Sequence, residues 1–183
     1  MFTNFPIIDL GSIKLREIQE TDVNNFYKYI TNPKVKKYLF DEDIPSDLER
    51  AKSELMYWAS LYSMFKSIYW AITDAKNNKL IGTSGFNTWN IIHRRVEISY
   101  DLCPDYWGRG IMTEVVRAIT DFAFDKMDVL RSQATVATDN ISSIRVLEKC
   151  GYKNEGILKN FAVLHGESRD FYMYAISRVD IQA

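Results

Sequence analysis

The stretch Asp101-Leu102-Cys103-Pro104-Asp105-Tyr106-Trp107-Gly108-Arg109-Gly110-Ile111-Met112-Thr113-Glu114 joins the end of a strand to a glycine loop and the start of a helix. Upstream, apolar residues alternate with polar ones from Val96 to Leu102, which is the period-2 pattern of a strand. Downstream, apolar residues recur at three- and four-residue intervals from Met112 to Met127, which predicts an amphipathic helix. We therefore expect a strand over 94–103 and a helix over 110–126.

Gly108 and Gly110 lie where that helix begins. Glycine allows a tight turn and lets a ligand approach the N–H groups of the first helical turn, which have no partner within the helix and carry the positive end of its dipole. The loop is therefore an expected anion site, with phosphate as the usual occupant. It is neither of two better-known phosphate loops, because Thr113 replaces the third glycine of the dinucleotide fingerprint and Ile111 replaces the lysine of the nucleotide-triphosphate loop.

Composition indicates one domain over residues 1–183. The hydrophobic content of 46% and the aromatic content of 14% are enough for a sizeable core. Lys and Arg number 23 against 24 Asp and Glu, so the chain lacks the overall positive field of a nucleic-acid-binding protein. No signal peptide and no run of 18 apolar residues is present, which predicts a cytoplasmic protein without a membrane partner.

The two cysteines, Cys103 and Cys150, have neither metal-binding nor redox spacing. We expect both to be reduced and buried as small apolar residues, with a reactive thiol at Cys103, beside the glycine loop, as the alternative. No metal site is expected.

The rest of the chain predicts strands and helices in a mixed order. The expected strands are 13–18, 68–73, 79–86, 94–103, 132–137, about 152–160 and 168–177. The expected helices begin at Thr21, at Pro33, at a capping box over Ser46–Glu49, at Gly110 and at Asn140. The third helix should bury one face made of Leu48, Ala51, Leu55, Trp58 and Ala59. Because a helix connects strands 94–103 and 132–137, these two should be parallel.

Three stretches resemble the Gcn5-related N-acetyltransferases (GNAT), and within them the branch that acetylates the N-termini of ribosomal proteins. The stretches are Arg94–Tyr100, Met112–Glu114 and Asn140–Tyr152, and the resemblance covers roughly residues 10 to 178. The loop 107–112 matches the family pattern Gln/Arg-x-x-Gly-x-Gly/Ala at its central Gly110. The resemblance implies an α/β (α+β) GNAT fold, with a mixed, mostly antiparallel sheet of about six or seven strands, a splayed central parallel pair and helices on both faces.

The resemblance also implies acetyl-CoA as co-substrate. Pantetheine would bond to backbone near Tyr100 and Leu102, and the diphosphate would meet the N–H groups of 108–112. The implied cofactor-binding residues are Tyr100, Leu102, Trp107, Gly108, Arg109, Gly110, Ile111, Met112, Asn140, Ser143, Arg145 and Lys149. Arg109, Arg145 and Lys149 would add positive charge at the phosphates, the alternative being ordinary surface cations. Asn140 is in either case an expected helix N-cap.

Glu97 occupies the position where the family often carries the general base, which removes a proton from the acceptor amine. The alternative is an ordinary acid on the strand face, or an ion pair with Arg94 or Arg95. His93 and His165 are the alternative bases.

The departing thiolate needs a different candidate. Leu147 stands where many family members have the Tyr that protonates it, so the resemblance implies that Ser143 and Asn140 lie beside the thiol. Backbone N–H groups near Tyr100 to Leu102 would bind the oxyanion.

The expected function is N-acetyl transfer from acetyl-CoA to a primary amine, most simply a protein or peptide N-terminus. Two alternatives are a polyamine acceptor, since Ile92-His93-Arg94-Arg95 also resembles spermidine-acetylating relatives, and a non-catalytic acyl-CoA-binding module. Acceptor specificity should come from segment 33–64, the turn 89–93 and the loop 160–168. Asp41-Glu42-Asp43 is the only tight acidic run there, whereas a polyamine needs several carboxylates. A homodimer is left open.

Overall fold

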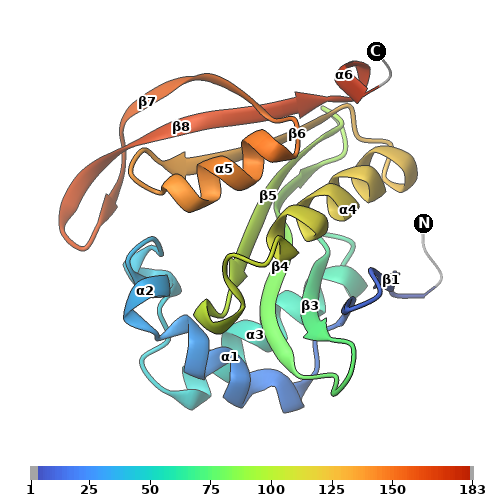
Figure 1. Ribbon diagram of the computed structural model, residues 1–183, viewed down its shortest axis with the longest axis vertical. Coiled ribbons are helices and arrows are strands. Elements are labelled where there is room, and N and C mark those ends of the chain that lie inside the picture. Colours follow the sequence, from blue (N-terminus) through green and yellow to red (C-terminus); the bar gives the residue numbers. More distant parts are fainter. Residues whose placement is uncertain (1–3, 182–183) are drawn as a thin grey trace. The chain divides into compact units, whose positions relative to one another are not determined.

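The computed structural model describes residues 4–181 as a mixed sheet of eight strands with helices between them (Figure 1). The strands are β1 (Ile8–Asp9), β2 (Ile13–Glu17), β3 (Tyr69–Asp74), β4 (Leu80–Asn90), β5 (Arg95–Leu102), β6 (Arg131–Ala137), β7 (Lys153–Leu164) and β8 (Glu167–Ser177). Their order is β1-β2-β3-β4-β5-β6-β8-β7. The predicted fold class is confirmed. The strand number is one higher than the upper expectation because the two-residue β1 is too short to show a pattern.

The α-helices are α1 (Val23–Ile30), α2 (Pro33–Lys36), α3 (Leu48–Ser63), α4 (Ile111–Lys126), α5 (Ile141–Lys149) and α6 (Arg178–Ile181). Three short 3-10 turns precede or follow them: η1 (Glu20–Asp22), η2 (Asp41–Asp43) and η3 (Pro104–Tyr106). Within 4–181 none of the helices combines the length and the apolar character needed to cross a membrane.

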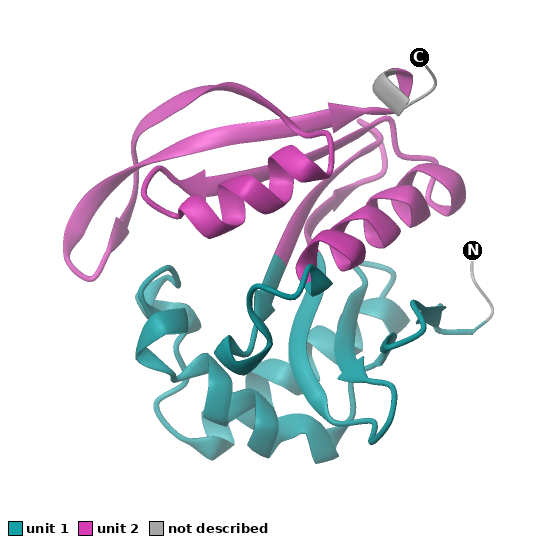
Figure 2. Cartoon of the chain, in the orientation of Figure 1, with its two compact units in different colours: residues 1–85, 100–111 teal, residues 86–99, 112–183 magenta. Residues whose placement is uncertain are grey.

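The described residues divide into two units, coloured in Figure 2. Unit 1 contains 4–85 and 100–111, and unit 2 contains 86–99 and 112–181. The chain changes unit inside β4, between Gly85 and Phe86, and inside β5, between Ser99 and Tyr100. Both units therefore depend on the same two strands.

Unit 1 has an antiparallel sheet with its core against α1 and α3. β2 pairs with β3 from Ile13↔Asp74 to Glu17↔Trp70, and β3 pairs in turn with β4. The core cluster includes the fully buried Phe26, Ala51, Leu55 and Ala71. Trp58 of α3 stacks on Tyr69 of β3 with ring centroids 5.2 Å apart, so Trp58 packs helix against sheet.

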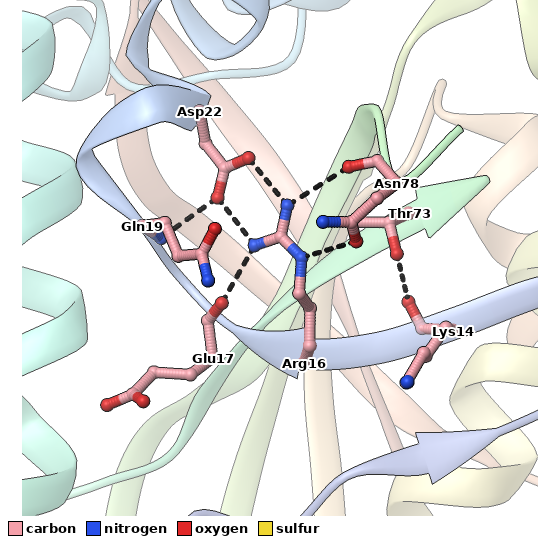
Figure 3. A network of polar contacts seen from close by, with 7 residues as sticks. All are labelled: Lys14, Arg16, Glu17, Gln19, Asp22, Thr73 and Asn78. Atoms are coloured by element: carbon pink, nitrogen blue, oxygen red, sulfur yellow. Dashed lines mark hydrogen bonds and ion pairs between the residues drawn. The ribbon is translucent and has the colours of Figure 1, made fainter. Parts of the chain in front are cut away.

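A buried ion pair holds the start of unit 1 together (Figure 3). The Arg16 guanidinium donates to both carboxylate oxygens of Asp22, at 2.7 and 2.8 Å, and its Nε donates to Asn78 Oδ1 at 2.8 Å. Asp22 also accepts from the backbone N–H of Gln19 at 2.9 Å. The network joins β2, η1 and the turn after β3 with its charges paired, which is the condition for burying them.

The predicted start of α3 is correct in position and wrong in detail. Asp47, not Ser46, is the N-cap, and its carboxylate accepts from the backbone N–H of Arg50 at 2.8 Å. Ser46 only donates its hydroxyl to Asp47, at 2.8 Å. Leu48 is 43% exposed rather than part of the buried face, because it is the first residue of the helix and lies before its first contacts with the core.

Unit 2 contains the parallel pair. β5 and β6 pair at Arg95↔Arg131, Val96↔Ser132 and Glu97↔Gln133, which confirms the predicted parallel arrangement. β6 then stays paired with β8 as far as Ala137↔Phe171, while β5 continues to Leu102. The short shared register agrees with the expected splay of the two strands.

A buried hydroxyl cluster attaches α4 to this sheet. The Tyr152 hydroxyl lies 2.8 Å from Thr120 Oγ1 of α4 and 2.6 Å from Ser132 Oγ of β6. Burial raises the pKa of Tyr152 to about 12, so its hydroxyl stays neutral and bonds both partners.

A separate contact joins α5 to the last strand. The Tyr174 hydroxyl of β8 donates to Glu148 of α5 at 3.1 Å.

Two segments expected as a turn or a loop contain strand residues. β4 runs to Asn90, so Trp89 and Asn90 belong to it rather than to the following turn. β7 and β8 leave only His165 and Gly166 between them, so most of the expected loop 160–168 is a hairpin. Polar residues in an edge hairpin do not alternate clearly with apolar ones. The strands predicted from the sequence were therefore shorter than those in the structure.

Candidate functional site

The glycine loop has the open backbone that an anion site requires. Gly108 and Gly110 adopt φ values of +73° and +81°, where other residues are strained, and α4 begins at the next residue, Ile111. A Cβ at either glycine would have no heavy atom within 4 Å. The space beside both glycines is therefore open, and the first N–H groups of α4 have no partner within the helix.

Trp107 attaches this loop to the end of β5. Its indole N–H donates to the carbonyl oxygen of Leu102 at 2.7 Å, while 43% of the residue remains exposed. The N–H of Cys103 donates to the carbonyl of Ile81 on β4, also at 2.7 Å. One lone pair of the Leu102 carbonyl, which we expected to meet pantetheine, is thus already used by the protein.

The three cations expected near the phosphates lie in different units: Arg109 in unit 1, and Arg145 and Lys149 in unit 2. Arg109 donates to the carbonyl of Asp105 at 2.6 Å, and its guanidinium lies 5.1 Å from the centre of the Tyr106 ring, so it folds back on its own loop in unit 1. Arg145 and Lys149 are exposed, four residues apart on α5 in unit 2. The structure brings the last two onto one helix face.

Glu97 lies on β5 with the alternation that the sequence predicts, half-buried between the buried Val96 and Ile98. Its carboxylate accepts from Gln133 Nε2 at 3.4 Å and from Thr135 Oγ1 at 3.2 Å, both on β6. Arg94, one of the two cations named as an alternative partner of Glu97, pairs with Asp128.

Gln133, one of the two donors to Glu97, is itself held by a further contact. Arg131 Nε donates to Gln133 Oε1 at 3.1 Å. The same guanidinium makes two parallel bonds to Glu155 of β7, at 2.8 and 2.6 Å. Sequence reasoning missed Gln133, Thr135 and Arg131, because only the strand register shows that they lie beside Glu97.

The start of α5 has the expected cap. Asn140 Oδ1 accepts from the backbone N–H of Ser143 at 3.2 Å, which confirms Asn140 as N-cap. Ser143 is half-buried in the first turn, and Leu147 is fully buried one turn further on. The two histidines, His93 and His165, are exposed in turns.

An acidic group in unit 1 was missed. Asp101 of β5 accepts from the Tyr29 hydroxyl at 2.6 Å, from Thr83 N–H at 3.0 Å and from the Thr83 hydroxyl at 2.7 Å. Burial raises the pKa of Asp101 despite these donors, and burial beside Asp101 raises the pKa of Tyr29 well above its usual value. The alternation of β5 marked Asp101 as polar, but nothing in the sequence indicated its partners.

Glu54 of α3 is a second acidic residue of unit 1 that the sequence did not single out. Burial, followed by repulsion from Asp43, raises its pKa to about 7. Its Oε2 atom is buried without a hydrogen-bond partner. Burial and the neighbouring Glu42 raise the pKa of Asp43 as well. Asp43 of the acidic run 41–43 therefore lies near another carboxylate, Glu54, within the same unit.

No metal centre is indicated in the part of the chain that the structure describes, where no three His, Cys, Asp or Glu side chains gather. Cys103 and Cys150 are both free thiols and half-buried. Burial raises the pKa of Cys150 to about 11, which keeps that thiol protonated and unreactive.

Comparison with known proteins gives a consistent picture. Residues 12–153 match the family described as acetyltransferase (GNAT) domain. An uncharacterized N-acetyltransferase of Bacillus subtilis, YoaA, is 33% identical over 94% of this chain and 97% of its own length. A spermidine N(1)-acetyltransferase of Escherichia coli is 23% identical over 87% of this chain and 82% of its own.

Among solved structures, the ribosomal L7/L12 alpha-N-protein acetyltransferase RimL in complex with coenzyme A resembles this chain with a TM-score of 0.86. The likeness covers 94% of this chain and 98% of that one at 22% identity. At that identity the likeness concerns the fold.

Proposed function

Because the chain belongs to the GNAT family of acetyltransferases, we propose that it transfers the acetyl group of acetyl-CoA to the N-terminal amine of a peptide or protein. Family membership supports the general reaction, which is N-acetyl transfer with acetyl-CoA as co-substrate. The acceptor and the roles of individual residues are the proposal.

The diphosphate of acetyl-CoA is assigned to loop 107–112. The support is the open, positive-φ backbone at Gly108 and Gly110 directly before α4, whose first N–H groups have no partner within the helix. Trp107 holds this loop to β5 through Leu102. Positive charge from Arg109, Arg145 and Lys149 is secondary, since all three are exposed and charge in water is screened.

Glu97 is assigned as the general base. An amine is mostly protonated at neutral pH and must lose a proton before its nitrogen can attack the thioester. Glu97 would take that proton directly or through a water molecule. It is half-buried, and each of its oxygens has a donor from β6, so the side chain has a defined direction.

Two further groups would handle the charges that form on oxygen and sulfur. Backbone N–H groups near Tyr100 to Leu102 would donate to the oxyanion. The Ser143 hydroxyl, half-buried in the first turn of α5, would donate to the leaving thiolate. Leu147 cannot do so, because it is apolar and fully buried.

The choice of a peptide acceptor rests on the few acidic residues in the segments expected to set acceptor specificity, where Asp41-Glu42-Asp43 is the only tight acidic run. The carboxylate of Asp101 is already occupied by Tyr29 and Thr83. A peptide N-terminus carries one positive charge and needs fewer carboxylates around it than a polycation does.

A polyamine is the second candidate, because Asp43 lies close enough to Glu54 to raise its pKa. Two carboxylates that repel each other would be relieved by a multiply charged amine between them. The family resemblance to a spermidine acetyltransferase is compatible with this alternative.

The deciding measurement is kcat/KM for a short Ser- or Ala-initiated peptide against spermidine, at equal ionic strength and saturating acetyl-CoA. We expect the peptide to be the better acceptor. A clear preference for spermidine would contradict the acceptor assignment. Failure to release CoA with either acceptor, while acetyl-CoA binds in calorimetry, would favour a non-catalytic acyl-CoA-binding module.

A further inference from the structure

Glu97 lies at the point where the two parallel strands stop sharing a register. Glu97↔Gln133 is the third of the three β5–β6 pairs, and both strands continue beyond it. Thr135 lies two residues further along β6, where that strand is paired with β8. The Thr135 hydroxyl nevertheless reaches back to Glu97 Oε1 at 3.2 Å. The carboxylate is therefore held by the residue paired with it and by the residue two positions further along β6.

The second donor is fixed by a chain of contacts. The amide of Gln133 donates to Glu97 Oε2 at 3.4 Å through Nε2. Its oxygen accepts from Arg131 Nε at 3.1 Å, so the amide must present its NH2 group to Glu97. Arg131 is itself held by two parallel bonds to Glu155. The order of Glu97 thus depends on residues of β6 and β7.

We propose that Thr135 and Gln133 are positioning residues, which hold the carboxylate of Glu97 in the orientation needed to accept the proton of the amine. This inference rests on the proposed role of Glu97 as general base. With one donor on each oxygen, rotation about the last side-chain torsion would break both bonds. Each oxygen still has a free lone pair for the amine or for a bridging water molecule.

The physical reason for such support is the geometric demand of proton transfer. A base must lie within hydrogen-bond reach of the proton that it removes, and a glutamate with free torsions spends most of its time elsewhere. The bonds to Glu97 are 3.2 and 3.4 Å long, so each is an ordinary rather than a strong hydrogen bond. Losing the Thr135 bond should therefore slow the chemical step by about tenfold and leave co-substrate binding unchanged.

The test compares Thr135→Val with Thr135→Ser. Valine has the shape of threonine without the hydroxyl and suits a strand, whereas serine keeps the hydroxyl. With saturating acetyl-CoA and the better acceptor of the peptide and spermidine pair, we expect Thr135→Val to lower kcat about tenfold and Thr135→Ser to stay within about threefold of the natural protein. The KM for acetyl-CoA should be unchanged in both. Equal kcat in the two variants would overturn the inference.

A double-mutant cycle separates positioning from a general structural effect. In a Glu97→Gln background, Thr135→Val should cause no further loss, because the residue acts only through Glu97. The same tenfold loss in that background would contradict the inference. Gln133→Met is a second variant with the same expectation, since it removes the amide and keeps the length of the side chain.

Glu97→Gln and Thr135→Val together distinguish the two proposals. A loss of roughly 10²-fold in kcat with an unaffected Thr135→Val variant leaves the base assigned and rejects the positioning residues. An unchanged kcat in Glu97→Gln rejects the base and, with it, the inference drawn here.

Discussion

At the scale of single residues, Glu54 shows how burial changes the chemistry of a carboxyl group. Its pKa of about 7 lies well above the ordinary value of 4.5, because burial and the nearby Asp43 both disfavour the charged form. Between these two pH values the folded protein keeps a proton that the unfolded chain releases. The free energy of unfolding must then fall as the pH rises from about 4.5 to about 7.

We predict that Glu54→Gln removes this part of the pH dependence. Glu54 is half-buried, so solvent screening reduces the effect to about 1–2 kcal/mol. The variant should match the natural protein at pH 4.5 and be more stable than it at pH 8. Denaturant unfolding at both pH values measures the difference. Glu49→Gln, on the exposed side of the same helix, is the control and should follow the natural protein; parallel curves for all three proteins would disprove the assignment.

Gly110→Glu tests the phosphate loop. We predict that it abolishes acetyl-CoA binding in calorimetry, because it places a side chain and a negative charge where the diphosphate is assigned. Gly11→Glu is the matched control, since Gly11 has a similar φ of +80° and equally open surroundings outside the loop. The control bears the same backbone strain and should keep its affinity. Unchanged affinity in a folded Gly110→Glu variant would place the site elsewhere.

The sequence predicted single residues only where a local pattern points to them. The alternation of β5 puts Glu97 on the polar face of the strand. Asn140 is predicted as an N-cap because it directly precedes residues with helical spacing of apolar side chains. Thr135 and Gln133 could not be found in this way. Their neighbours are set by the register of β5 with β6, and register depends on the packing of the whole sheet.

At the scale of elements, helix starts are encoded locally but ambiguously. Ser46 and Asp47 are adjacent residues that can both cap a helix, and only the backbone decides between them. In the structure Asp47 has the extended backbone of an N-cap and accepts the Arg50 N–H. The sequence thus located the start of α3 to within one residue.

Asp47→Ala should consequently destabilise α3, and Ser46→Ala should not. Loss of the cap leaves an N–H group of the first turn without its partner, and we expect the melting temperature to fall by about 2–4 °C. Differential scanning calorimetry measures both variants. A larger effect for Ser46→Ala would show that the capping box expected from the sequence is the correct arrangement.

Strand limits were the least predictable elements. β4 continues through Trp89 and Asn90, and the β7–β8 hairpin extends almost to His165. Extended backbone in such segments is held by ladder hydrogen bonds to a neighbouring strand, and side-chain type contributes little. Turn residues mark the hairpin but do not fix where its strands begin.

At the scale of the whole molecule, the two units share strands. β4 and β5 each contribute to both, so neither unit is a continuous piece of chain with its own complete sheet. We propose on this basis that the chain acts as one domain, as its length and composition indicate.

We predict a single unfolding transition in denaturant. Tryptophan emission reports chiefly on unit 1, which contains Trp58, Trp70 and Trp107, whereas far-UV circular dichroism reports on all helices and strands. Because breaking either shared strand disrupts both units, the two signals should have the same midpoint. Two separated midpoints would mean that the units unfold independently and would reject the one-domain proposal.

The close approach of β4 and β5 depends on Gly82. A Cβ at this position would collide with the carbonyl oxygen of Asp101 and lie 3.1 Å from the Leu102 Cα. Even alanine would force apart the strand that leads into the glycine loop. In evolutionary terms, position 82 should not accept other residues. Homologues that keep this strand pair should retain glycine there while the exposed surface around it diverges. A lineage that replaced this glycine would need to move β5 and the glycine loop together.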